Sequence, residues 1–172
     1  MAGMNAPILE LETCARLTAD WRRQGLTVVF TNGHFDLLHA GHVAYLQAAR
    51  AMGDRLVVGL NSDASTRRRK GPTRPLLPRQ ERALLLAALR AVDAVLLWRQ
   101  DDFRDAVAAL KPDIYVKGAD WNRAGGPQPP EAVIVENYGG SVAYVELTPG
   151  RSTSALVQEI LRRHGCERGE RA

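Results

Sequence analysis

Two histidines three residues apart, His39 and His42, are the strongest candidates for chemistry in this 172-residue sequence. They follow a β-branched run and a glycine turn at Gly33, and Gly41 lies between them, where a helix is expected to begin. At this spacing both imidazoles can lie on one helix face, beside the unpaired N–H groups and the positive end of the helix dipole. Such a group of donors favours a phosphate ligand. It could stabilise charge on phosphorus while pyrophosphate leaves.

Metal binding is an alternative interpretation of the same pair. The spacing of His39 and His42 differs from the HExxH pattern of zinc enzymes, and the sequence offers no evident third ligand. The complete context of strand, glycine turn, histidine pair and helix favours the phosphate interpretation.

Positive charge is concentrated in one part of the chain. The net charge is +4, yet residues 66–90 hold eight basic residues and one acid, which leaves −3 for the rest. A local basic cluster indicates an anionic ligand, although a solvated basic loop and helix face would look the same. Aromatic residues make up only 6% of the sequence, which argues against a stacking surface for nucleic acid. We therefore expect no nucleic-acid partner.

The elements that must position these residues alternate between strands and helices. Short apolar runs predict strands that are covered on both faces, and longer stretches between them predict helices. The expected strands are 27–30, 55–60, 94–98, 114–116 and 142–146, and the expected helices are 9–23, 41–52, 78–91, 103–110, 131–138 and 154–163. This order predicts an α/β fold, a Rossmann-like parallel sheet of about five strands with helices on both faces. Ligands of such sheets bind at the carboxyl ends of the strands.

Length and composition are those of one ordinary domain. We expect an N-terminal helix in 1–26 packed on the same domain, a main domain over 27–164 and a flexible tail over 165–172. The apolar runs are far shorter than the ~20 residues of a membrane span, and no secretory signal is evident. Cys14 and Cys166 form no disulfide framework or zinc motif. These features predict a cytoplasmic protein with no membrane partner.

Further segments strengthen a specific resemblance. In order after Thr31–His42, the matching segments are Gly59–Ser65, Arg69–Gly71, Arg74-Pro75, Glu81-Arg82, Val92-Asp93, Val116–Gly118 and Gly150–Thr153. Together they resemble the HxGH nucleotidyltransferase, or cytidylyltransferase-like, superfamily, and most closely the single-function heptose 1-phosphate adenylyltransferases. The resemblance implies transfer of AMP from ATP to heptose 1-phosphate, giving ADP-heptose and pyrophosphate for lipopolysaccharide inner-core synthesis. It also implies Mg²⁺ carried with ATP, and a homodimer.

The resemblance assigns roles to individual positions. The catalytic residues would be His39, His42 and Lys70, with Lys70 reaching the phosphates from a mobile basic loop. The nucleotide-binding residues would be Thr31, Asn32, Gly33, Phe35, Gly41, Lys117, Gly118, Arg151, Ser152 and Thr153, and the acceptor-binding residues would be Asp36, Asn61 and Asp63. Structural alternatives stay open. Asp36, Asp63 and the serine-threonine pair could be helix caps or helix partners, and Lys117-Gly118 could be a surface turn.

Other functions are compatible with the same motifs. One is a cytidylyltransferase acting on an alcohol phosphate such as glycerol 3-phosphate. Those enzymes carry an arginine where this chain has Leu147, which favours the heptose branch. Another is a non-catalytic nucleotide- or nucleic-acid-binding module. His34 stands where many relatives have cysteine, and 120–130 is unusually rich in glycine and proline, so neither is assigned a role.

Overall fold

Six parallel strands form one sheet in the computed structural model, which describes residues 5–122 and 128–165. The strands are β1 (Ile8–Leu9), β2 (Val28–Gly33), β3 (Arg55–Asn61), β4 (Ala94–Trp98), β5 (Ile114–Gly118) and β6 (Ser141–Val145), in the order β1-β4-β3-β2-β5-β6. The helices are α1 (Leu11–Arg23), α2 (Ala40–Arg50), α3 (Asp63–Lys70), α4 (Arg79–Ala87), α5 (Arg104–Leu110), the 3₁₀ turn η1 (Ala119–Asn122), α6 (Ala132–Asn137) and α7 (Thr153–His164). The predicted Rossmann-like α/β class is confirmed.

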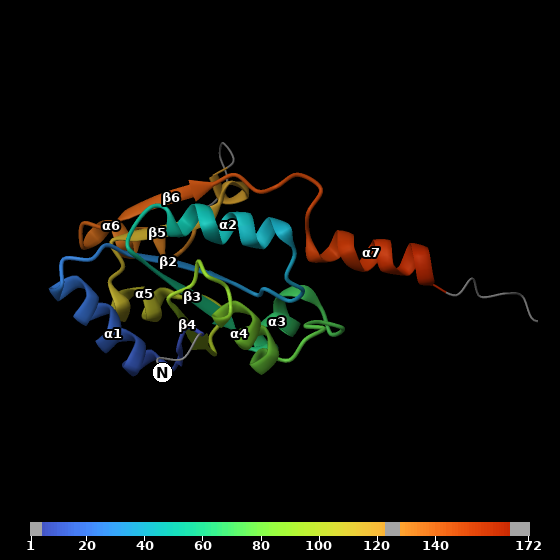
Figure 1. Ribbon diagram of the computed structural model, residues 1–172, viewed down its shortest axis with the longest axis horizontal. Helices are drawn as coiled ribbons and strands as arrows, with labels where there is room; N and C mark the ends of the chain where they lie inside the picture. The colour runs from blue at the N-terminus through green and yellow to red at the C-terminus, as the bar shows by residue number, and fades with distance from the viewer. Residues whose placement is uncertain (1–4, 123–127, 166–172) are drawn as a thin grey trace, which may run out of the picture.

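Helices cover both faces of the sheet (Figure 1). Each face has its own apolar core. Val29 of β2 points into the core shared with α2 and α4, whereas its neighbours Val28 and Phe30 point into the core shared with α1, α5 and α6. This alternation, with helices on both faces of the sheet, explains why the first half of β2, Val28–Phe30, is continuously apolar.

The strand order changes direction beside β2. The chain moves from β2 to β3 and β4 on one side, then crosses to β5 and β6 on the other. Val29 is paired with Leu56 of β3 and with Ile114 of β5, so β2 is a central strand. A crevice at the carboxyl ends of β2 and β5 is therefore the expected ligand site.

Two elements differ from the predictions. Leu9 was expected in the first helix, but it lies in β1, whose short run pairs with β4 at the sheet edge. The basic segment after β3 was expected to be a loop, but it forms α3. Neither two strand residues nor a polar helix carries the apolar periodicity from which elements are predicted.

The C-terminal helix α7 extends away from the sheet (Figure 1), and none of its residues is buried. The predicted flexible tail, apart from Gly165, lies outside the described residues. In the described part of the chain, no helix has the length and apolar character needed to cross a membrane.

Candidate active site

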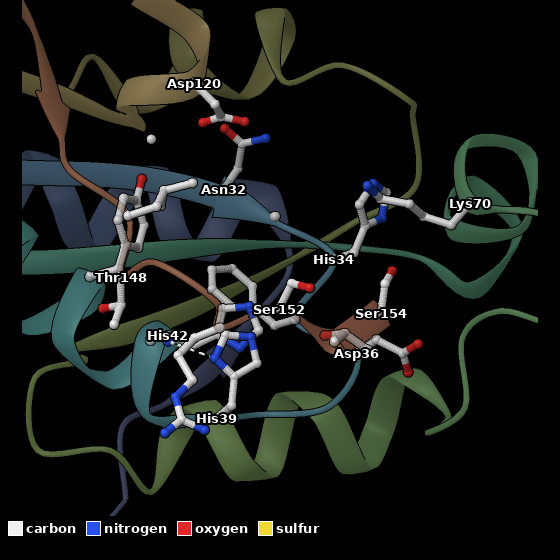
Figure 2. Close-up of a pocket in the computed structure, with 18 of the residues that line it drawn as sticks. Asn32, His34, Asp36, His39, His42, Lys70, Asp120, Thr148, Ser152 and Ser154 are labelled. Carbon is white, nitrogen blue, oxygen red and sulfur yellow. Dashed lines mark hydrogen bonds between the residues drawn. The ribbon is translucent and has the colours of Figure 1, made fainter. Parts of the chain in front are cut away.

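A cavity of about 390 Å³ opens at the carboxyl ends of β2 and β5, and is called the main cavity below. This volume is within the usual range for small-molecule sites. The sequence-predicted residues that line it are Asn32, Gly33, Phe35, Asp36, His39, Gly41, His42, Lys70, Lys117, Gly118, Arg151, Ser152 and Thr153. Segments far apart in the chain therefore converge on one site, as Figure 2 shows.

His39 and His42 lie at the start of α2, with their rings stacked and their centroids 3.8 Å apart. His39 is the N-cap residue, and its Nδ1 accepts the backbone N–H of His42 at 3.3 Å (Figure 2). Because Nδ1 is an acceptor there, neutral His39 carries its proton on Nε2, which is left as a donor. The structure thus brings together the two imidazoles whose spacing indicated a joint role.

Burial lowers the pKa of both rings. The pKa of His42 falls to about 4, mainly through burial and further through the nearby His39. The pKa of His39 is lowered by burial and then by the charge of Arg151. At neutral pH, both rings of the ligand-free protein are therefore neutral, and they offer hydrogen-bond donors rather than fixed positive charges.

The residues next to the two histidines are closely packed against them. A Cβ on Gly41 would lie 3.0 Å from His39 Nδ1 and 3.1 Å from the Arg151 Cβ, so any larger residue would push these side chains aside by a few tenths of an ångström. The ring centroid of Phe35 is 5.2 Å from that of His42, and Phe35 has a φ of 43°. A positive φ in an aromatic residue is strained, and such strain is common at functional sites.

Lys70 is the last residue of α3 rather than part of a loop, which corrects the prediction. Ser62 caps this helix by accepting the Ser65 N–H at 3.2 Å. The basic residues 67–70 fill its last turn, where the helix dipole favours positive charge. Gly71, with a φ of 102°, ends the helix. Lys70 therefore reaches the main cavity from a helix end.

Some arginines of the basic segment are paired with acids within the protein. Arg68 makes a two-pronged contact with Asp101, and Arg74 donates to Asp36 Oδ2 at 2.7 Å. The other oxygen of Asp36 accepts the N–H groups of Leu76 and Leu77 at 2.7 and 3.2 Å. Asp36 is 5% exposed, so although it lines the main cavity its carboxylate primarily anchors the chain after α3. Asp36 caps neither α2 nor α4, and its acceptor-binding role stays a prediction.

Asn61 and Asp63 do not line the main cavity, and their acceptor role stays a prediction. The side-chain amide of Asn61 donates to Ser65 Oγ at 3.0 Å. Asp63 Oδ1 accepts from Arg82 at 2.7 Å. Arg82 is fully buried and also donates to the carbonyl groups of His34, Asn61 and Leu77. Both predicted residues thus belong to a structural network centred on Arg82.

Thr31, one of the predicted nucleotide-binding residues, does not line the main cavity either. It is buried, and its hydroxyl is 2.7 Å from the hydroxyl of Tyr45, which donates to the Val116 carbonyl at 3.1 Å. Tyr45 lines the main cavity, whereas Thr31 lies behind it. Thr31 therefore holds a lining side chain in place.

The end of β5 supplies a second wall of the main cavity. Lys117 is 7% exposed, with its Nζ 4.6 Å from the centroid of the Trp121 ring. Burial lowers the pKa of this lysine. A Cβ on Gly118 would lie 2.5 Å from the Asp120 carboxylate, so glycine here accommodates Asp120. Lys117 and Gly118 belong to a cavity wall and not to a simple surface turn.

The start of α7 closes the cavity on another side. Ser152 is the N-cap, and its hydroxyl accepts the Ala155 N–H at 3.1 Å. Thr153 donates to the Leu37 carbonyl at 3.3 Å, which ties α7 to the loop before α2. The capping and ligand-facing interpretations therefore both describe this segment, since a helix start that lines a cavity can also bind an anion.

Sequence reasoning left several lining residues unassigned, including His34, Tyr45, Thr66, Trp121 and Thr148. His34 Nδ1 is 3.0 Å from the hydroxyl of Thr66, and burial together with nearby cations, Lys70 foremost, lowers its pKa to about 4. Sequence reasoning did not single out Tyr45 as a lining residue, because it fits the apolar pattern of α2. Sequence reasoning could have identified Arg82 as a residue with buried partners, because this charged residue lies on the buried face of α4.

Comparison with known proteins places the chain in a family. Residues 30–163 match the model of the family described as cytidylyltransferase-like. The chain belongs to the cytidylyltransferase-like family. The bifunctional protein HldE of Syntrophotalea carbinolica is 53% identical over 147 residues, which are 83% of this chain and 29% of that protein. HldE of Magnetococcus marinus is 54% identical over 142 residues, 83% of this chain and 28% of that protein.

This cytidylyltransferase-like chain thus spans less than a third of the length of those two relatives. It also resembles the solved structure of a lipopolysaccharide core biosynthesis protein from Thermoplasma volcanium GSS1. That match has a TM-score of 0.59 and 28% identity, and it covers 72% of this chain and 98% of the other.

Metal binding by the protein's own side chains finds little support in this cytidylyltransferase-like domain. Across residues 5–122 and 128–165, no three His, Cys, Asp or Glu side chains cluster so that they could hold a metal ion. Asp36 is already engaged with Arg74 and two backbone N–H groups. The residues present fit an ion whose ligands come mostly from a phosphate chain and water.

Proposed function

We propose that the chain transfers AMP from ATP to heptose 1-phosphate, releasing pyrophosphate and giving ADP-heptose for lipopolysaccharide inner-core synthesis. The observation that carries this proposal is the stacked pair His39 and His42, which faces a cavity also lined by Lys70. Family membership and similarity to HldE support nucleotidyl transfer, and the lipopolysaccharide relative supports the sugar acceptor.

The site suits direct displacement at phosphorus. The acceptor phosphate oxygen attacks the α-phosphorus of ATP. The bond between this phosphorus and the oxygen that bridges to the β-phosphorus breaks, and pyrophosphate leaves with that oxygen. His39 and His42 donate hydrogen bonds to the oxygens on which charge accumulates. Cys14 is buried and burial raises its pKa to about 12, so it is unsuited to act as a nucleophile. No covalent enzyme intermediate is required.

Mg²⁺ would enter with ATP. It would offset charge on the triphosphate, and the chain's own contribution would be to orient that triphosphate between α2, Lys70 and the start of α7.

Nucleotide choice tests the proposal. We expect ATP to be preferred over CTP by at least about 10-fold in kcat/KM, equivalent to about 1.4 kcal/mol. The discrimination should come from main-chain groups and cavity size near Lys117 and Gly118, where mismatched polar groups would be left unpaired. The experiment pairs each nucleotide with heptose 1-phosphate and glycerol 3-phosphate and measures pyrophosphate. Equal or better use of CTP, or of glycerol phosphate, would assign the chain to the cytidylyltransferases instead.

Removal of the Lys70 ammonium should affect catalysis more than binding. In Lys70→Ala we expect kcat to fall by about 10-fold or more while the KM for ATP changes little, because the contact is made most fully in the transition state. Arg67→Ala, on the same helix and exposed, is the matched control and should retain activity. A rise confined to the KM for ATP would show that Lys70 only binds the ground state.

We also expect a homodimer, formed through the region beside α2. Ile160 and Leu161 of α7 are 53% and 62% exposed, and a second copy could cover this apolar surface as well. Light scattering at tens of micromolar should give twice the chain mass of 18.9 kDa. A mass of one chain at that concentration would contradict the prediction.

A further inference from the structure

Tyr115 lies outside the main cavity but contacts a residue that lines it. Its side chain is fully buried near the start of β5, with the ring stacked on Phe30 at a centroid distance of 6.0 Å. Its hydroxyl donates to Asn32 Oδ1 at 2.7 Å. Asn32 stands near the carboxyl end of β2, on the side of the cavity opposite His39 and His42 (Figure 2).

A second donor fixes which way the Asn32 amide faces. The ammonium of Lys117 lies 3.3 Å from the same oxygen. An ammonium has no lone pair and can only donate, so the atom it meets must be the amide oxygen, and the amide cannot be reversed. Burial and the neighbouring Glu131 raise the pKa of Tyr115, so its hydroxyl keeps the proton that it donates.

With its oxygen occupied twice, Asn32 has only donors to offer a ligand. Its Nδ2 makes no hydrogen bond to another residue of the described chain, and the residue is only half buried where it lines the main cavity. The Lys117 ammonium is the adjacent group on the same wall. Two neighbouring donors of this kind suit an acceptor atom, such as an oxygen or ring nitrogen of a nucleotide.

We propose that Tyr115 is a positioning residue: its hydroxyl holds the Asn32 amide so that Nδ2 donates a hydrogen bond to the bound nucleotide. The inference rests on the proposed function only in taking a nucleotide as the ligand. It requires neither the heptose acceptor nor the chemical step.

The test is a double-mutant cycle on binding of α,β-methylene ATP with Mg²⁺, measured by calorimetry. Tyr115→Phe removes one hydroxyl and should weaken binding about 5-fold, because Lys117 alone then holds the amide in place. Asn32→Ala should weaken binding about 10-fold. In the Asn32→Ala background, Tyr115→Phe should have no further effect, since the hydroxyl acts through the amide.

Two more variants separate positioning from general stability. Tyr138→Phe removes a hydroxyl that donates to the Pro112 carbonyl at 2.8 Å outside the cavity, and binding should be unchanged. Asn32→Asp keeps an acceptor for Tyr115 but replaces Nδ2 with an oxygen, so binding should fall at least 10-fold even though the shape is conserved. Thermal unfolding of each variant confirms that it is folded.

Several results would overturn the inference. Unchanged binding in Tyr115→Phe would do so, as would an equal loss in the wild-type and Asn32→Ala backgrounds, or full binding by Asn32→Asp. Failure of the wild-type protein to bind the analogue would remove the nucleotide as ligand. By contrast, normal binding without turnover of heptose 1-phosphate would contradict the proposed reaction and leave the role of Tyr115 standing.

Discussion

Replacing either His39 or His42 with alanine is expected to lower turnover about 10²–10³-fold, the usual effect of losing one donor that stabilises transition-state charge. Both imidazoles line the main cavity at the start of α2, and their lowered pKa values keep them neutral before the nucleotide binds. The effect should appear in kcat, because the donors contact charge that accumulates during the reaction. Steady-state pyrophosphate release measures it.

His39 also caps α2, so its two roles must be separated. His39→Asn keeps a good N-cap but removes the ring donor, and it should lose turnover as His39→Ala does while retaining more stability. His164→Ala, an exposed histidine at the far end of α7, is the control and should be fully active. Near-normal turnover in both His39→Ala and His42→Ala would rule out this mechanism.

Replacing Arg82 with methionine is expected to lower the free energy of unfolding by about 3 kcal/mol, the lower end of the range for removing one partner of a buried ion pair, because the Asp63 side chain is 30% exposed. The guanidinium is fully buried and donates to Asp63 Oδ1 at 2.7 Å and to the carbonyls of Asn61 and Leu77 at 3.0 Å each. It also donates to the His34 carbonyl. Methionine leaves all of these acceptors without their donor.

Urea unfolding measures this change, with Arg90→Met as the control because Arg90 is exposed just beyond α4. The control should shift stability by no more than about 0.5 kcal/mol. A loss below about 1 kcal/mol in Arg82→Met would show that the network does not hold β2, β3 and the helices together. Because His34 lies in the cavity wall, the variant should also have reduced activity where it remains folded.

The fold could be predicted because its signals are local. Apolar runs such as residues 55–60 and the helix after Gly41 show their period within a few residues. The misassigned elements lacked that signal. β1 is two residues long and exists only because Ile8 pairs with Val95 of β4, and α3 is stabilised by a cap and its charges rather than by an apolar face.

The histidine pair could be predicted for the same reason, since a spacing of three at a helix start fixes its geometry. Partners distant in sequence could not be predicted. In the sequence Asp36 looks available as a ligand, because its contacts with Arg74 and Leu76, about 40 residues away, are visible only in the structure. Asp63 likewise meets Arg82 only in the folded chain. Residue type shows what a side chain can do, whereas its partners determine whether it remains available.

Isotope labelling of the acceptor tests the central claim most directly. Heptose 1-phosphate carrying ¹⁸O in its phosphate is incubated with Mg²⁺ and ATP, and the products are examined by mass spectrometry and ³¹P NMR. Attack of the acceptor phosphate on the α-phosphorus predicts that all the label is in ADP-heptose, including the bridging oxygen, and that pyrophosphate is unlabelled. Labelled pyrophosphate, or no ADP-heptose from folded protein that binds ATP, would contradict the account.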